Sequence, residues 1–149
     1  MSIGIHTVDE DVAQAVEYIE NDHCHDALPL LARVVSFEPA NATAHELWVV
    51  CHIRTGRLER AIELADEGLA RGLSPLTLTL EKSAALRLLE RYDEAVEVAT
   101  IAATIDPDSP RPVRAVAVTQ LARGETGAAL NTQSGLSYSI LRRKWSDRI

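Results

Sequence analysis

Six histidine and cysteine side chains between residues 23 and 52 could bind a metal ion. They are His23, Cys24, His25, His45, Cys51 and His52. Imidazole nitrogen and thiolate sulfur are the ligands that zinc prefers, so a metal or redox site is one hypothesis. The spacing matches no common zinc motif, and three consecutive side chains cannot all point at one ion. We therefore favour small apolar cysteines in or near the core and surface histidines, and we expect no cofactor.

Catalytic motifs are absent from the sequence. It contains no glycine-rich phosphate loop and no G-x-S-x-G turn, and Val49 stands four residues after His45, where an H-E-x-x-H motif needs a second histidine. Carboxylates such as Glu63 and Glu67 instead have the spacing of a solvated helix face, where Arg60 can pair with them. We therefore predict that the protein is not an enzyme.

Length and composition exclude several further classes of protein. The chain has 149 residues, enough for one domain, and 46% of them are hydrophobic and 25% charged, as in soluble globular domains. No apolar run reaches the roughly 20 residues that a membrane span requires, and residues 1–10 lack the features of a secretory signal. Two cysteines are too few for a disulfide scaffold, so we expect a cytoplasmic protein.

The charge is negative and unevenly distributed. A net charge of −7 argues against a nucleic-acid partner, because nucleic-acid-binding proteins are normally basic. Residues 1–75 hold 13 acidic and 5 basic side chains, whereas residues 76–149 hold 9 acidic and 10 basic ones. The two halves therefore differ in charge, which gives the molecule an electrostatic direction.

A constant period runs through the chain. Four segments align on Ala27, Ala61, Ala95 and Ala129, with the same spacing at every step, and each alanine is followed by an aliphatic residue. Five residues before these alanines, tight turns are expected at Asp22, Gly56, Glu90 and Gly124. Self-similarity at one fixed period predicts helical hairpins that stack on one another, because a single hairpin cannot bury its apolar face alone.

This pattern resembles the tetratricopeptide repeat family, whose unit of about 34 residues is a helix–turn–helix with a small residue early in the second helix and a proline after it. Pro39 follows Ala27 at the same distance as Pro107 follows Ala95. The resemblance implies an all-α fold, a right-handed solenoid of four hairpins in a single domain. The repeats are expected at about 8–41, 42–75, 76–109 and 110–141, followed by a basic tail at 142–149.

Local signals place the individual helices. We expect them at residues 8–20, 26–37, 42–55, 58–71, 75–89, 92–105, 110–122 and 126–141. Thr7 and Glu10 have the spacing of a capping box at the start of the first helix. Pro29 favours a second helix that begins with Asp26 as its cap, because the proline then lies in the first turn, where its missing N–H costs little. Residues 23–25 would then form the connection.

The last expected helix ends the solenoid without a separate capping helix. It carries Leu130, Leu136 and Ile140 on one side. Repeat proteins need a polar cap on their last unit to stay soluble, so we expect a partner for this apolar face. The simplest partner is a second copy in a symmetric homodimer, and the alternative is the basic tail folding back with Trp145.

The resemblance also implies a concave groove lined by the first helix of each hairpin. It assigns to that groove an apolar floor and flanking charges: Val12, Val16, Ile19, Glu46, Val50, Ile53, Leu80, Ala84, Arg87, Leu88, Arg111, Arg114, Val118 and Leu121. Such a floor suits an amphipathic helix or an extended segment of another protein. The implied function is a protein–protein interaction module that acts as an adaptor or scaffold.

Two subgroups of the family offer more specific roles. Members that clamp the C-terminal carboxylate of heat-shock chaperones use asparagine and lysine in the groove, whereas Val16, Val50, Ala84 and Val118 stand where those asparagines are expected. The chain is more similar, in size, acidity and groove character, to small bacterial chaperones of type III secretion, which hold an apolar secreted segment. That chaperone role is the alternative function, and a metal-binding or redox protein is a less favoured one.

Overall fold

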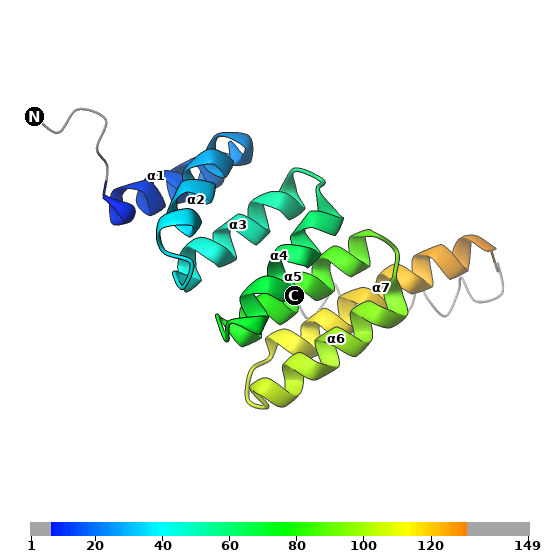
Figure 1. Cartoon of the computed structure of the whole chain (residues 1–149). Helices are drawn as coiled ribbons and strands as arrows, with labels where there is room; N and C mark the ends of the chain where they lie inside the picture. The colour runs from blue at the N-terminus through cyan, green and yellow to red at the C-terminus, as the bar shows by residue number, and fades with distance from the viewer. Residues whose placement is uncertain (1–6, 131–149) are drawn as a thin grey trace, which may run out of the picture.

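Seven α-helices form the part of the chain that the computed structural model describes, which is residues 7–130, with side chains to residue 124. No strand occurs within this range (Figure 1). The helices are α1 (Val8–Glu20), α2 (Cys24–Phe37), α3 (Ala42–Arg54), α4 (Leu58–Ala70), α5 (Pro75–Leu88), α6 (Tyr92–Ile105) and α7 (Arg111–Leu130). Six of the seven begin within one residue of the predicted position, and the all-α fold is confirmed.

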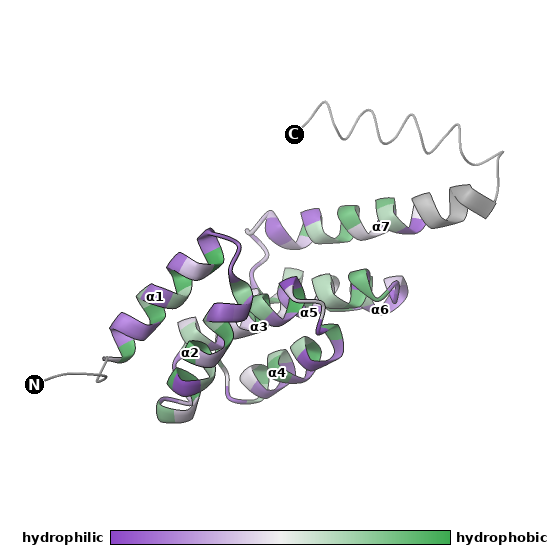
Figure 2. Ribbon diagram, turned by 90° about the horizontal axis from the view of Figure 1, so that it is seen from above, coloured by the Kyte–Doolittle hydropathy of each residue, from purple (hydrophilic) through white to green (hydrophobic). Residues whose placement is uncertain are grey.

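The helices stack as a solenoid. Each helix packs against its neighbours in sequence, and α1, α3, α5 and α7 also contact one another in order, whereas α2, α4 and α6 do not contact each other. Because the inner helices of a curved stack approach one another most closely, the odd-numbered helices line its concave side. Figure 2 shows hydrophobic and hydrophilic residues sharing single helices, as expected of helices with one buried face.

Left-handed backbone residues close the three hairpins at the predicted positions. Asp22, Gly56 and Glu90 have φ values of 63°, 81° and 62°. After each of them the next N–H donates to a carbonyl five residues back, as in His23 N to Tyr18 O at 2.7 Å, which satisfies a carbonyl at the helix end. The first helix has its predicted cap, because the Thr7 hydroxyl accepts from Glu10 N at 3.1 Å and the Glu10 carboxylate accepts from Thr7 N at 3.3 Å.

The predicted start of the second helix is wrong. Helix α2 begins at Cys24 rather than after Asp26, so Pro29 lies inside it. Cys24, one of the two extra helical residues, is buried in the first core cluster, and this burial favours the earlier start. Proline removes the bond to the His25 carbonyl, but His25 is exposed, so water can replace that bond.

The predicted turn at Gly124 is also wrong. Helix α7 runs without interruption from Arg111 to Leu130, so the eighth helix expected at 126–141 does not begin at residue 126. In the first three hairpins the column that contains Leu31 buries an apolar side chain, whereas the fourth repeat has Gln133 there. Folding back would bury an amide, while continuing α7 adds a backbone hydrogen bond for each residue. Residues 131–149, with the rest of that helix and the tail, lie outside the described residues.

Close helix contact at α4 gives the fold a direct test. A Cβ atom at Gly68 would lie 2.5 Å from Leu78 Cδ1 and 2.7 Å from His45 Cδ2. The His45 ring cannot move easily, because its Nε2 donates to the Leu64 carbonyl at 2.6 Å and the side chain is 1% exposed.

We therefore expect Gly68→Val to lower the free energy of unfolding by about 1–3 kcal/mol or more through overpacking. Urea denaturation followed by circular dichroism measures the change. Glu67→Ala, on the exposed face of the same turn, is the control and should change stability by less than about 0.5 kcal/mol. Equal stability of Gly68→Val and wild type would contradict the packing of α4 against α3 and α5.

Candidate peptide-binding groove

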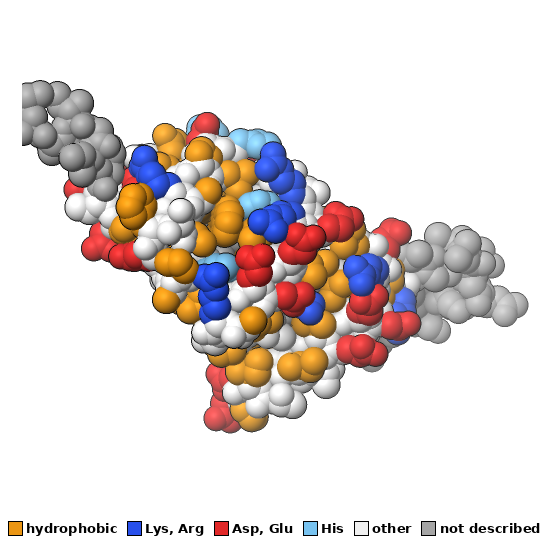
Figure 3. All heavy atoms as spheres, in the orientation of Figure 1, with side chains coloured by type: hydrophobic (Ala, Val, Ile, Leu, Met, Phe, Trp, Pro, Cys, Tyr) orange, Lys and Arg blue, Asp and Glu red, His pale blue; other side chains and the backbone are white. Residues whose placement is uncertain are grey.

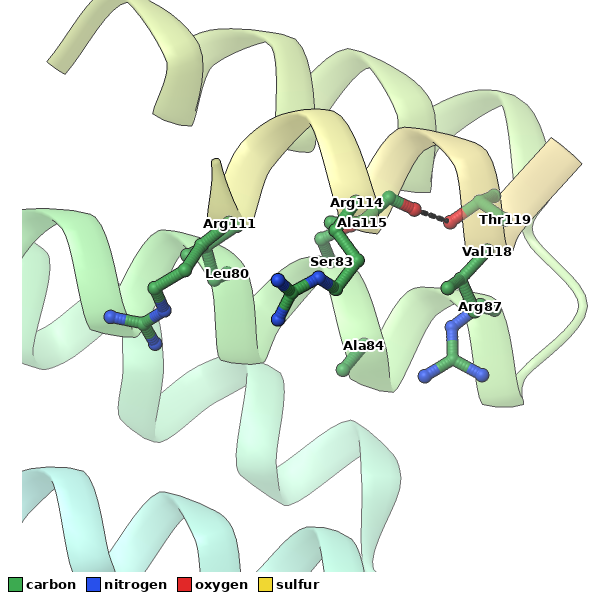
Figure 4. A pocket seen from close by; sticks show the side chains of 9 residues that line it. All are labelled: Leu80, Ser83, Ala84, Arg87, Arg111, Arg114, Ala115, Val118 and Thr119. Carbon is green, nitrogen blue, oxygen red and sulfur yellow. Dashed lines mark hydrogen bonds between the residues drawn. The ribbon is translucent and has the colours of Figure 1, made fainter. Parts of the chain in front are cut away.

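Helices α5 and α7 form a pocket on the concave side of the solenoid. Its volume is about 220 Å³, and Figure 4 shows it from close by. The lining residues are Leu80, Ser83, Ala84 and Arg87 of α5 and Arg111, Arg114, Ala115, Val118 and Thr119 of α7. The hydroxyls of Ser83 and Thr119 donate to the carbonyls of Ala95 and Ala115, both at 2.8 Å, so neither hydroxyl needs a ligand. The pocket therefore offers an apolar floor and three guanidinium groups.

The three arginines extend to the same side of the two helices (Figure 4). Arg111 and Arg114 are exposed, and Arg87 is half-buried. Arg111 Nη1 donates to Thr77 Oγ1 at 3.3 Å. Within the described residues none of the three forms an ion pair with a carboxylate, so their charge faces the open side of the pocket.

A carboxylate that sequence reasoning did not assign to the groove lies beside this pocket. Burial raises the pKa of Glu81, while the nearby Arg111 and Arg54 oppose that shift and Glu46 adds to it. These groups come from α3, α5 and α7, so their charges meet where three concave helices are adjacent. Glu46 also lines a shallower hollow of about 350 Å³ with residues 74–77 and the end of α6.

The structure brings six of the groove residues assigned by the family resemblance into one pocket: Leu80, Ala84, Arg87, Arg111, Arg114 and Val118. Towards the N-terminus the assigned residues lie on α1 and α3, and Val12, Val16, Val50 and Ile53 are half-buried. Ile19 is 8% exposed and belongs to the first core cluster. At the other end, Leu121 is half-buried and Leu88 is 50% exposed.

The cysteines lie in the core. Cys24 and Cys51 are both buried as free thiols. Burial raises the pKa of Cys51 to about 12, and the neighbouring Cys24 thiol adds to the shift through its charge and a hydrogen bond. The thiols of α2 and α3 thus meet. A buried thiol that resists ionisation, as Cys51 does, is a poor metal ligand or nucleophile.

The histidines of the same cluster are separated from one another. His23 and His25 are exposed, as expected, but the prediction of surface histidines is wrong for His45 and His52, which are both buried. Their burial is possible because His45 bonds the Leu64 carbonyl and His52 Nδ1 bonds the Trp48 carbonyl at 2.8 Å. Burial lowers the pKa of His52. Among the described residues no three histidine, cysteine or acidic side chains are grouped so that they could hold a metal ion.

We expect both thiols to resist alkylation in the native protein, because both are buried, so the reagent cannot reach them, and because burial also raises the pKa of Cys51. Iodoacetamide at mildly alkaline pH should react at least about a hundredfold more slowly with the native chain than with the chain unfolded in urea. Mass spectrometry after timed quenching measures the rates. Similar rates in the two states would mean that one of the thiols is accessible.

The chain is similar to a known protein family in sequence and to solved structures in fold. Residues 12–76 match the family model of the tetratricopeptide repeat. No curated protein sequence matches the chain. Within residues 7–130 no helix is both long and apolar enough to cross a membrane.

Solved structures of MamA have a similar fold. The structure titled MamA MSR-1 superposes with a TM-score of 0.62 at 19% identity, covering 93% of this chain and 79% of that one. MamA AMB-1 gives 0.60 at 20% identity, covering 92% and 74%. A MamA mutant gives 0.58 at 20% identity, covering 87% and 77%. At these identities the likeness concerns the fold. Residues 12–76 therefore belong to the tetratricopeptide repeat family, and the described helices that follow continue its solenoid.

Proposed function

We propose that this protein is a non-catalytic interaction module of the cytoplasm that binds a segment of another protein on its concave side, as an adaptor or scaffold. The observation that carries the proposal is the pocket between α5 and α7. It combines an apolar floor with guanidinium groups that form no ion pair with a carboxylate of the described residues. Apolar contact supplies affinity for a peptide, and charged groups at the edge supply specificity and speed of association.

A column of aliphatic side chains supports a groove longer than this pocket. Val16, Val50, Ala84 and Val118 stand one repeat period apart on α1, α3, α5 and α7, and all four are half-buried. They repeat along the concave layer, so an apolar strip follows the stacking direction. An amphipathic helix or an extended segment with apolar side chains on one face fits such a strip.

The alternatives have less support. A chaperone for a type III secretion component would use the same strip, and no residue of the pocket favours that role over an adaptor. A metal or redox function would need accessible cysteines, whereas Cys24 and Cys51 are buried. The interaction module is therefore the function that the geometry supports best.

Replacing Val50 by glutamate tests the concave side. The carboxylate would be desolvated against an apolar partner without a compensating charge, so we expect Val50→Glu to weaken binding at least about tenfold. The partner is first captured from native cell extract, identified by mass spectrometry and then titrated as a purified protein. Ile101→Glu is the control, because Ile101 is 55% exposed on α6, outside the concave layer.

Circular dichroism and thermal unfolding establish that both variants fold. If a folded Val50→Glu variant bound with wild-type affinity, the concave side would not be the binding surface. The convex side or the basic tail at 142–149 would then become the better candidate.

We also propose a homodimer through the end of the solenoid. Thr79 and Ser83 of α5 are buried, and the Ser83 hydroxyl bonds α6. Their equivalents in the next repeat, on α7, are Val113, which is 68% exposed, and Ala117. These two residues line a hollow of about 270 Å³ between α6 and α7. Within the described residues no helix covers this face, so a second copy can bury it.

Sedimentation equilibrium at high micromolar concentration tests the dimer. We expect wild type to sediment as a dimer and Val113→Glu as a monomer, because the substitution places a carboxylate in an apolar interface. Ala70→Glu, at the exposed end of α4, should remain dimeric. A wild-type protein that is monomeric throughout would instead favour a face covered by its own tail, which lies outside the described residues.

A further inference from the structure

The arginine-lined pocket is unusual in a chain of net charge −7. On the face drawn in Figure 3, acidic and basic side chains lie intermixed. Arg60, for example, bonds Glu63 at 2.9 Å, and Lys82 bonds Asp66 at 2.8 Å. In the pocket, three arginines from two helices share one opening, and none of them forms an ion pair with a carboxylate of the described residues.

The nearest acid compensates this charge only in part. Glu81 interacts with Arg111, but no carboxylate is paired with Arg87 or Arg114 in the described chain. Three guanidinium groups against one carboxylate leave an excess of two positive charges at this end of the groove. Like charges held together repel one another, and a bound anion removes that repulsion.

The surroundings of the arginines define the chemistry of the anion. Leu80, Ala84, Ala115 and Val118 form the floor between the arginines, so the ligand must carry an apolar group as well as negative charge. A guanidinium group matches a carboxylate with two parallel hydrogen bonds. A long polyanion such as a nucleic acid would continue past the pocket and meet the carboxylates of Glu81 and Glu46 along the groove. A short acidic segment would not.

We infer that the C-terminal end of the groove, formed by Arg87, Arg111 and Arg114, recognises a partner segment in which at least two aspartate or glutamate side chains flank an apolar side chain. The apolar side chain sits on the pocket floor, and the carboxylates bind the arginines. This inference rests on the proposed function, because it specifies the partner of the same groove. It also sets a direction, since the acidic end of the segment lies over α5 and α7.

Three fluorescent peptides with the same leucine face and amidated ends test the inference. One carries glutamates at its charged end, one glutamines at the same positions, and one lysines. We expect the glutamate peptide to bind at least about tenfold more tightly than the glutamine peptide at roughly 50 mM salt, and the lysine peptide to bind most weakly. Because salt screens exposed charges, the advantage should fall several-fold at about 300 mM salt.

Charge reversal in the pocket provides the decisive comparison. The double variant Arg111→Glu with Arg114→Glu should bind the lysine peptide more tightly than the glutamate peptide, which a merely misfolded protein would not do. Both arginines are exposed, so the variant should keep the wild-type helix content. Arg57→Glu is the matched control, because Arg57 is an exposed arginine at the start of α4, outside the pocket, and it should leave the order of affinities unchanged.

The outcomes separate the inference from the proposed function. Equal binding of all three peptides, abolished by Val50→Glu, would keep the groove and overturn the acidic preference. Binding of none would overturn both. Displacement of the glutamate peptide by a single-stranded oligonucleotide at lower concentration than by the unlabelled peptide would overturn the choice of a protein partner.

Discussion

The close approach of helices at small residues is the constraint on which the structure depends. Ala27, Ala61 and Ala95 are completely buried near the start of the second helix of each hairpin. A methyl side chain at this column lets each second helix lie against the first one, and at Ala95 the contact is close enough for Ser83 to bond its carbonyl. Larger residues would push the helices apart. The concave layer and its pocket exist because this close contact recurs in each of the three described hairpins.

The period made most of the fold predictable, because the turns and the small-residue column follow it. The two wrong predictions about helices, the start of α2 and the turn at Gly124, were decided by burial and not by the local preferences of proline and glycine. Pro29 suggested a later start for α2, but the core that Cys24 enters favours the longer helix. Gly124 suggested a turn, but glycine permits a turn without requiring one, and the fourth repeat has Gln133 in the column where the first three repeats bury an apolar side chain. Neither the start of α2 nor the continuation of α7 can be judged from the sequence of one repeat alone.

Only those residues of the candidate site that lie in the repeat columns could be predicted from the sequence. The three arginines lie in columns that the family assigns to the concave side, and the structure gathers them at one pocket. The sequence did not reveal Glu81 as a groove residue, because the charged groups around it lie on α3 and α7. These helices pack against α5 but are far from Glu81 in the sequence. The stacking of α2 on α3 accounts for the meeting of Cys24 with Cys51, but the burial of both thiols is visible only in the packed structure.

The pattern of helix contacts has a mechanical consequence. Every helix touches only the next one or, in the concave layer, the next but one, so no contact ties the first hairpin to the last within the described chain. The curvature of such a stack is the sum of small rotations at successive helix interfaces. When the two ends move together or apart, each interface therefore changes only slightly. A segment that lies along several concave helices would therefore link interfaces that the chain's own contacts leave independent of one another.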